Sequence, residues 1–508
     1  SESYRRIVKE SQLYDHALHG EAWVYVRMQK WQHAIDTFRR LVNLFPHSPL
    51  YGDALYRIAE SYQNLKQKEE AKQGYKQYLA AYPRGQLAPA ARLQLALLDM
   101  RNDRFEEAVE TLRQLRLQFV GTEQAIEAQY WLGMVFFRQE RFDAAVEEFQ
   151  SLVNTSPTHP RAATALLRIA DAYYNDKQFR TALIAYQKID ILYPQTPLVA
   201  DAQYGAVLSY FQVQQYPQFL REVRVFIQTF AQHPLSVSLL LQVAEYYQRQ
   251  GRLEDAIKTY TRLVEQYPQS PLVDKAWFRL GGLFMLAGKP QQALLTYERL
   301  LQEGQIEDLK PDALLGQGKA YEALSDRSAA LQSYTQIAEV YPESGLAAQG
   351  LYRAGRLLMA EENYQEAQHY FEAVVERYPT EPIRFPSSFQ LGVAFLRLQQ
   401  PGEAIEWLQQ ALQTPDRHHA AQVQLTIGRA YSDAGKIQES INAYMRVAYL
   451  YADETELVTQ ALRQAARHYV VLKKCAEAVT VYTKLLKRIS DAQQIQEVQR
   501  EMADRGCP

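Results

Sequence analysis

The 508-residue sequence predicts an all-α solenoid of about a dozen similar helical hairpins, each stacked on the next. Three observations predict this fold. A turn marker recurs every 37 residues, small and aromatic residues recur together in each unit, and proline-containing turns separate the units. We expect one array over residues 15–490, preceded by the tail of another hairpin at 1–14 and followed by a polar capping helix at 491–508.

The turn markers keep one spacing over most of the chain. Aromatic residues stand 37 residues apart, or a multiple of 37, at Phe45, Tyr82, Phe119, Tyr193, Phe230, Tyr267, Tyr341 and Tyr378. The spacing slips by one residue near Thr414 and resumes at Tyr451. Chance does not hold one spacing over so long a stretch, so each interval is one structural repeat.

Each repeat carries the pattern of two packed helices. The second helix has an alanine followed four residues later by a large side chain, as in Ala71 and Tyr75. The first helix has a small residue, such as Ala59 or Gly318, with an aromatic three residues beyond it. Glycine inside a helix costs about 1 kcal/mol relative to alanine. Its recurrence at one place therefore predicts that the helices cross closely.

Proline turns join one hairpin to the next, as in Tyr193-Pro194-Gln195-Thr196-Pro197-Leu198. The first proline cannot continue the preceding helix, and the threonine-proline pair supplies an N-cap and a first-turn proline for the following one. Two repeats depart from the pattern. Phe219 stands where alanine is expected and Asp99 replaces an aromatic, so we expect these two repeats to pack less regularly.

The small, aromatic, alanine and proline positions resemble those of the tetratricopeptide repeat (TPR) family over essentially the whole chain. In the second repeat they are Ala59, Tyr62, Ala71, Tyr75 and Pro83. The resemblance implies a right-handed α-solenoid of TPR helix-turn-helix hairpins, whose first helices line a concave surface that binds other proteins.

The tyrosine-proline linkers and the slightly long repeat are similar to those of bacterial envelope members of this family, such as the outer-membrane assembly lipoprotein BamD and the Tol-Pal-associated periplasmic coordinator. This similarity favours a periplasmic or outer-membrane-associated location, with a cytoplasmic location as the alternative.

The family's first-helix register gives two rows of residues that we expect to face a partner. One row holds Tyr56, Tyr130, Tyr204, Phe278 and Tyr352, and the other holds Phe137, Tyr174 and Phe211, with Arg138 beside it. Aromatic residues and arginine are enriched at protein-binding hot spots, so a peptide segment or a helix of a partner would bind in this groove. The alternative is that the rows pack against the next hairpin.

No residue pattern indicates catalysis, a metal site or a cofactor. The run Gly316-Gln317-Gly318-Lys319 lacks the glycine spacing and the Ser/Thr of a phosphate-binding loop. The adjacent His418 and His419 would point about 100° apart on a helix and cannot hold one metal ion together. We therefore expect no catalytic residue, no metal, no cofactor and no small-molecule substrate.

Net charge, apolar runs and cysteines indicate which kinds of partner and structure the sequence allows. Lys+Arg 56 against Asp+Glu 58 gives a net charge of −2, which argues against nucleic acid as the partner. No apolar run approaches the roughly 20 residues of a membrane-spanning helix. Cys475 and Cys507 are the two cysteines, and they either form a disulfide at the end of the array or remain unrelated thiols.

The sequence thus predicts a non-catalytic protein-protein interaction scaffold that organises a bacterial envelope assembly, as a component of a membrane complex, through its concave first-helix surface. Two alternatives stay open. In the first, the chain is a substrate- or partner-recruiting arm of a larger enzyme or transporter whose other domain lies upstream of Ser1. In the second, it is a structural component that associates with itself.

Overall fold

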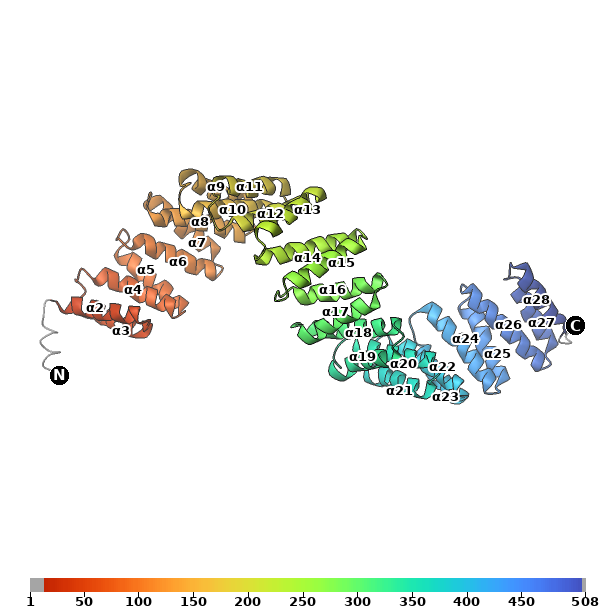
Figure 1. Ribbon diagram of the computed structural model, residues 1–508. Coiled ribbons are helices and arrows are strands. Elements are labelled where there is room, and N and C mark those ends of the chain that lie inside the picture. The colour runs from red at the N-terminus through yellow and green to blue at the C-terminus, as the bar shows by residue number, and fades with distance from the viewer. Residues whose placement is uncertain (1–12, 505–508) are drawn as a thin grey trace. The chain divides into compact units, whose positions relative to one another are not determined.

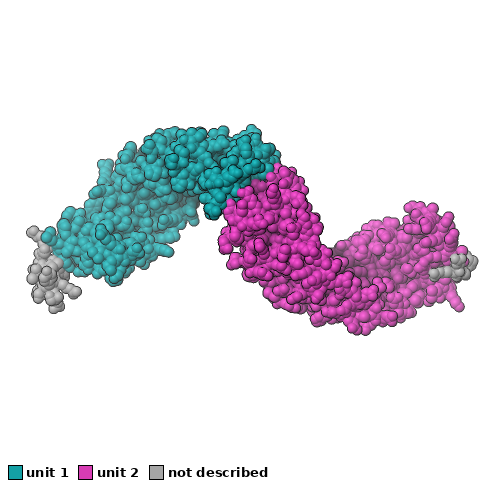
Figure 2. All heavy atoms as spheres, in the orientation of Figure 1, with its two compact units in different colours: residues 1–236 teal, residues 237–508 magenta. Residues whose placement is uncertain are grey.

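The computed structural model describes residues 13–504, and these residues form 27 α-helices and one short 3-10 helix, with no strand among them (Figure 1). The chain divides into two compact units, residues 1–236 and 237–508 (Figure 2). Consecutive helices pair as antiparallel hairpins inside each unit, as a solenoid requires. The predicted all-α solenoid is confirmed.

The described part of unit 1 holds six hairpins. Their helices are α2 (Tyr14–Arg27) and α3 (Trp31–Leu44), α4 (Tyr51–Asn64) and α5 (Lys68–Ala81), α6 (Ala88–Arg101) and α7 (Phe105–Gln118), α8 (Glu123–Arg138) and α9 (Phe142–Thr155), α10 (Pro160–Asn175) and α11 (Phe179–Leu192), and α12 (Val199–Gln212) and α13 (Tyr216–Thr229). The next helix, α14 (Pro234–Arg249), contains the division between the units.

In unit 2, α14 pairs with α15 (Leu253–Gln266). The hairpins that follow are α16 (Val273–Leu286) and α17 (Pro290–Glu303), α18 (Lys310–Ala323) and α19 (Arg327–Val340), α20 (Ala347–Ala360) and α21 (Tyr364–Arg377), α22 (Arg384–Arg397) and α23 (Pro401–Ala411), α24 (Arg417–Asp433) and α25 (Ile437–Leu450), and α26 (Thr455–Val471) and α27 (Cys475–Leu486). The 3-10 helix Glu307–Leu309 precedes α18, and α28 (Ala492–Asp504) is the last described helix.

The second helices reproduce the spacing seen in the sequence. They begin every 37 residues from Trp31 to Pro401. The slip near Thr414 falls between α23, which has 11 residues, and α24, which has 17. A shortened helix followed by a lengthened one therefore absorbs the change in spacing.

Each hairpin turns through one residue in the left-handed backbone region, two positions before the second helix begins. Examples are Lys66, Glu140 and Gly288, with φ of 62°, 58° and 68°. The N–H of Gln67 donates to the carbonyl oxygen of Tyr62 at 3.0 Å, which closes the end of α4 in the manner of a Schellman motif. The sequence pattern did not predict this turn, because most residues at this position are not glycine.

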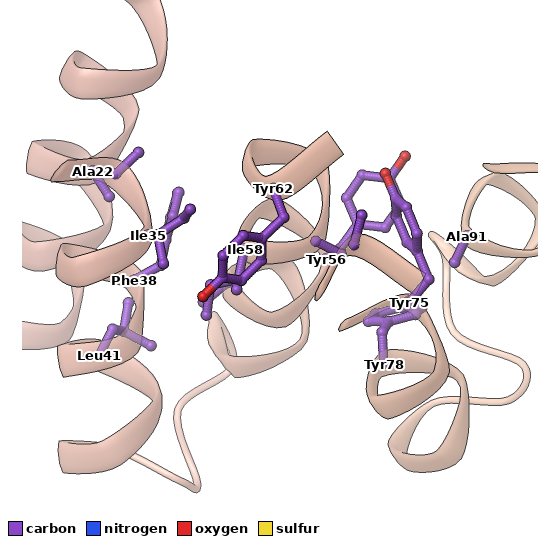
Figure 3. Close-up of a cluster of buried hydrophobic side chains, with 14 of the residues drawn as sticks. Ala22, Ile35, Phe38, Leu41, Tyr56, Ile58, Tyr62, Tyr75, Tyr78 and Ala91 are labelled. Atoms are coloured by element: carbon purple, nitrogen blue, oxygen red, sulfur yellow. The ribbon is translucent and has the colours of Figure 1, made fainter. Parts of the chain in front are cut away.

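The interior is filled by small residues set against large ones, as predicted. In the core of the first repeats Phe38, Tyr75 and Ala59 are fully buried, and Figure 3 shows the aromatic and aliphatic side chains of this cluster gathered between the helices. A Cβ added at Gly318 would stand 2.3 Å from the ring of Tyr334. First-helix glycines therefore permit the close crossing of the two helices.

Both departures from the repeat pattern keep the common helix lengths. Phe219 is fully buried and its ring centroid lies 5.1 Å from that of Phe211, so the aromatic takes the place of alanine inside the core. Asp99 is 2% exposed and forms an ion pair with Lys72, which is 7% exposed. A buried ion pair thus replaces the usual contact between an aliphatic and an aromatic residue.

The predicted polar capping helix corresponds to α28 within the described residues. Val498 is 1% exposed and joins the core of the last hairpins. Glu501 accepts hydrogen bonds from Arg463 and Arg467 of α26, and Glu497 accepts one from Arg463 at 3.0 Å. The largely polar helix α28 therefore packs on the apolar face of the preceding hairpin, and its role as a cap of the array stays a prediction.

We expect α28 to detach from α26 in acid. Burial alone would raise the pKa of Glu501, but the hydrogen bonds and charges of Arg467 and Arg463 lower it from 4.5 to about 2. Because the folded pKa is depressed, this stabilisation is present above pH 4.5 and is lost as the pH falls towards 2. Hydrogen exchange of α28, corrected for intrinsic rates, should accelerate over this range. Glu501→Gln should exchange faster at neutral pH and lose most of the pH dependence.

Candidate functional site

The first-helix face of unit 1 contains a cavity of about 430 Å³ between α10 and α12. Its lining combines charged, aromatic and aliphatic side chains, namely Arg168, Asp171, Tyr174, Asp201, Tyr204 and Leu208. The 37-residue repeat places these residues on one face, because α10 and α12 contact each other and present equivalent turns. Apolar walls with a few polar groups are typical of sites that bind a partner segment.

The carboxylate of Asp171 is held in place by its neighbours. Nη1 of Arg168 donates to Oδ2 at 2.8 Å, and the hydroxyl of Tyr186 donates to Oδ1 at 2.8 Å. Burial raises the pKa of Asp171, although the hydrogen bond from Tyr186 and the charge of Arg168 act in the opposite direction. Nε of Arg168 has no hydrogen-bond partner among the described residues. The cavity therefore presents a carboxylate whose position is fixed by two hydrogen bonds.

Tyr56 and Tyr130 of the first predicted row belong to the core. Their side chains are 6% and 4% exposed, and their rings contact Tyr75 and Phe149 with centroids 5.5 Å and 5.6 Å apart (Figure 3 labels Tyr56 and Tyr75). Burial raises the pKa of Tyr56 to about 12. For these two residues the burial favours the alternative that the row packs against neighbouring helices, and their contact with a partner stays a prediction.

The other members of the first row are half-buried. Tyr204 lines the cavity, and its ring centroid lies 6.5 Å from that of Phe226. In unit 2, Phe278 and Tyr352 keep part of their surface exposed, and Tyr352 packs against Phe371 at 5.8 Å. These three residues retain the surface that a partner-binding role needs.

The aromatic residues of the second row pack across the hairpin turns. Phe137, Tyr174 and Phe211 are half-buried, and each meets the first residue of the following helix edge-on. The ring centroids are 5.6 Å apart for Phe137–Phe142, 5.2 Å for Tyr174–Phe179 and 5.6 Å for Phe211–Tyr216. Arg138 is exposed, and its Nη1 donates to the carbonyl oxygen of Met100 at 3.3 Å. Of the nine predicted residues, the cavity brings together Tyr174 and Tyr204.

Comparison with known proteins decides the family. Three family models, each described as tetratricopeptide repeat, match the chain: one at 93–160, 224–308 and 352–418, one at 16–48, 53–84, 164–196 and 312–344, and one at 421–454. The chain is a tetratricopeptide repeat protein. Members of this family are generally non-catalytic scaffolds, and the TPR repeats described above indicate a protein-protein interaction scaffold.

Solved structures with the same repeat are similar to this TPR protein. The APC/C hetero-tetramer Cut9-Hcn1 is 15% identical with a TM-score of 0.31, covering 90% of this chain and 98% of that one. MamA is 16% identical with a TM-score of 0.30, covering 35% and 90%. The C-terminal part of a TPR repeat-containing protein from Cytophaga hutchinsonii is 15% identical with a TM-score of 0.43, covering 51% and 98%. No curated protein sequence matched.

Two further cavities lie on the outer side of the TPR hairpins, between neighbouring second helices. One, of about 650 Å³, is lined by residues of α3, α4 and α5, and the other, of about 460 Å³, by residues of α15, α16 and α17. They occupy the same place in their repeats, because Tyr62 of the first and Phe284 of the second are six repeats apart. The sequence pattern did not predict these two cavities. The available signal was the small residue on each second helix, Gly74 or Thr296.

The described residues contain neither a metal-binding cluster nor a membrane-spanning helix. Over residues 13–504, no group of three or more His, Cys, Asp and Glu side chains is arranged to hold a metal ion. The helices of that range are all too short or too polar to cross a bilayer. Cys475 begins α27, whereas Cys507 lies outside the described residues, as does most of the predicted hairpin tail at 1–14. The disulfide therefore remains a prediction.

Proposed function

We propose that this TPR protein binds a segment of a partner protein on its first-helix face, and that the cavity between α10 and α12 is one of its contact sites. The observation that supports this is the convergence of Asp171, Tyr174, Tyr204 and Leu208 around one cavity. Bonds from within the chain already fix the position of the carboxylate of Asp171, so little side-chain entropy is lost on binding. Several such contacts along an array combine into useful affinity.

We further propose that the partners belong to a bacterial envelope assembly and that the protein acts in the periplasm or at the outer membrane. The tyrosine-proline linkers at 193–198 and 267–272 support this location through their similarity to envelope members of the family. Crosslinking in the native cells, followed by mass spectrometry, tests it. Envelope proteins crosslinked to α10 and α12 are the expected result. Cytosolic partners would contradict the location.

A pair of matched variants tests the cavity itself. Leu208→Asp places a charge among the lining residues, so we expect about tenfold weaker retention of the crosslinked partners, equivalent to about 1.4 kcal/mol. Ile184→Asp makes the same kind of change on α11, where Ile184 is 57% exposed on the outer side, and should leave retention unchanged. Circular dichroism should show equal helix content in both variants. Equal retention of partners by both variants would show that the cavity is not part of the binding surface.

A further inference from the structure

Basic side chains gather on the first helices of unit 2. They are Lys275 and Arg279 on α16, Lys319 on α18, Arg353 and Arg356 on α20, and Arg397 on α22, and we call this set the basic face. The net charge of the whole chain is −2, so this accumulation is local. Among the described residues, Arg353 approaches Glu322 at 3.8 Å, and the other five cations take part in no ion pair there. These five lysine and arginine side chains thus form no ion pair with a carboxylate of residues 13–504.

The equivalent place in unit 1 has a different charge. Lys319, Arg353 and Arg356 stand four repeats after Asp171, Gly205 and Leu208 of the cavity between α10 and α12. The surrounding frame is similar, because the hydroxyl of Tyr186 donates to Asp171 and that of Tyr334 donates to Glu322, each at 2.8 Å. Three equivalent positions therefore differ in charge between the units. In unit 1 they carry one carboxylate, and in unit 2 they carry three cations.

Like charges meet inside the basic face. Lys319 is half-buried on α18, and Arg353 on the next first helix, α20, is close enough for its charge to act on Lys319. Burial and the charge of Arg353 both lower the pKa of Lys319, although Glu322 and Asp312 act in the opposite direction. Holding two cations together in partial burial costs folding free energy unless an anion joins them.

At the end of the described chain, the position equivalent to Lys319 has a carboxylate partner. Lys319 and Arg356 each follow the small residue of their first helix, and Arg467 follows Ala466 in the same way. Arg467 and Arg463 are bound by Glu501 of the adjoining helix α28, and Glu497 also binds Arg463. At Lys319 the adjoining first helix brings Arg353 in place of a glutamate. The adjoining first helix therefore supplies no carboxylate to Lys319, in contrast to Glu501 at Arg467.

We infer that the basic face binds an acidic polypeptide segment of a partner, with carboxylates that pair with Lys319, Arg353 and Arg356; this rests on the proposed scaffold function. The half-buried rings of Phe278 and Tyr352 lie on the same first helices, so the segment also carries apolar side chains. Asp312 and Glu322 lie among the cations, so a segment whose carboxylates are separated by apolar side chains suits the basic face better than an uninterrupted run of phosphates.

Binding to the full chain tests this inference directly. The probe is a fluorescein-labelled peptide that repeats Glu-Glu-Leu, compared by anisotropy with a Gln-Gln-Leu repeat and with oligothymidine. We expect saturable binding of the acidic peptide that weakens with salt. The double variant Lys319→Glu, Arg356→Glu should bind it at least tenfold more weakly. The matched control, Lys258→Glu, Arg299→Glu, reverses two exposed charges on the second helices α15 and α17 and should bind like the original chain.

A second measurement separates the binding role from folding. Lys319→Glu alone places a carboxylate beside Arg353, so hydrogen exchange in α18 and α20 should slow while peptide binding falls. Faster exchange there would overturn the inferred repulsion. The inference also fails if the acidic peptide does not bind, if the control loses as much affinity, or if oligothymidine binds more tightly. If native partners still crosslink to the first-helix face but ignore Lys319→Glu, Arg356→Glu, this inference alone fails and the scaffold function stands.

Discussion

Replacing Asp99 by alanine should destabilise the hairpins around α5 and α6 by about 3–5 kcal/mol, because the change leaves the ammonium of Lys72 buried without its counter-charge. Neither side chain reaches bulk solvent, since Lys72 is 7% and Asp99 is 2% exposed. A repeat array does not unfold as one unit, so the measurement is the local opening free energy from hydrogen exchange of α5 and α6.

The control replaces both charges together. The next repeat carries Val109 and Phe136 at the places of Lys72 and Asp99. Lys72→Val, Asp99→Phe should therefore be close to neutral or stabilising, since apolar packing replaces two desolvated charges. A double variant as unstable as Asp99→Ala would show that the backbone here does not accept the apolar pair. A loss below about 1 kcal/mol in Asp99→Ala would show that water reaches Lys72.

The pair of Lys72 and Asp99 also shows what a single sequence can and cannot predict. Asp99 stood out because it breaks a repeated aromatic position, and the pattern predicted irregular packing there. Lys72 breaks a repeated aliphatic position in the neighbouring repeat and passed unnoticed. Periodicity reveals each exception separately, whereas the contact between α5 and α6 that joins them exists only in three dimensions.

The hairpins were predictable because their spacing is encoded locally. Proline turns, small residues and aromatic residues recur at fixed places, and each place has one structural meaning in every repeat. The left-handed turn residue was not predictable in this way, since side chains as different as Lys66 and Glu140 occupy it. There the helices on either side determine the backbone conformation, and the residue type does not.

The binding residues were less predictable than the fold. Tyr130 and Tyr204 hold the same repeat position, yet Tyr130 is 4% exposed and Tyr204 lines a cavity. The difference lies in the following first helix, where the Arg161 guanidinium lies 4.7 Å from the centre of the Tyr130 ring, whereas Leu235 holds the corresponding place beside Tyr204. Exposure of a first-helix aromatic thus depends on side chains one repeat away, which no pattern within the repeat contains.

Adjacent glycines of α16 should respond in opposite directions to the same substitution. A Cβ at Gly281 would stand 2.6 Å from the ring of Tyr297, whereas the nearest atom to a Cβ at Gly282 is the Tyr297 hydroxyl oxygen at 3.9 Å. Gly281→Ala should therefore destabilise α16 and α17 by about 1–3 kcal/mol through overpacking. Gly282→Ala should stabilise the helix by up to about 1 kcal/mol, because alanine is the better helix former.

The repeats themselves suggest the compensating change. In the third repeat Ala96 stands where Gly281 stands, and Leu112 takes the place of Tyr297. Adding Tyr297→Leu to Gly281→Ala should recover part of the loss, and the double-mutant cycle should give a favourable coupling of about 0.5–3 kcal/mol. Local opening free energies of α16 and α17 from hydrogen exchange give all four corners of the cycle. Equal effects of the two single glycine substitutions would mean that helix propensity governs these positions. Close crossing of α16 and α17 would then not be the reason for glycine at this place in the repeat.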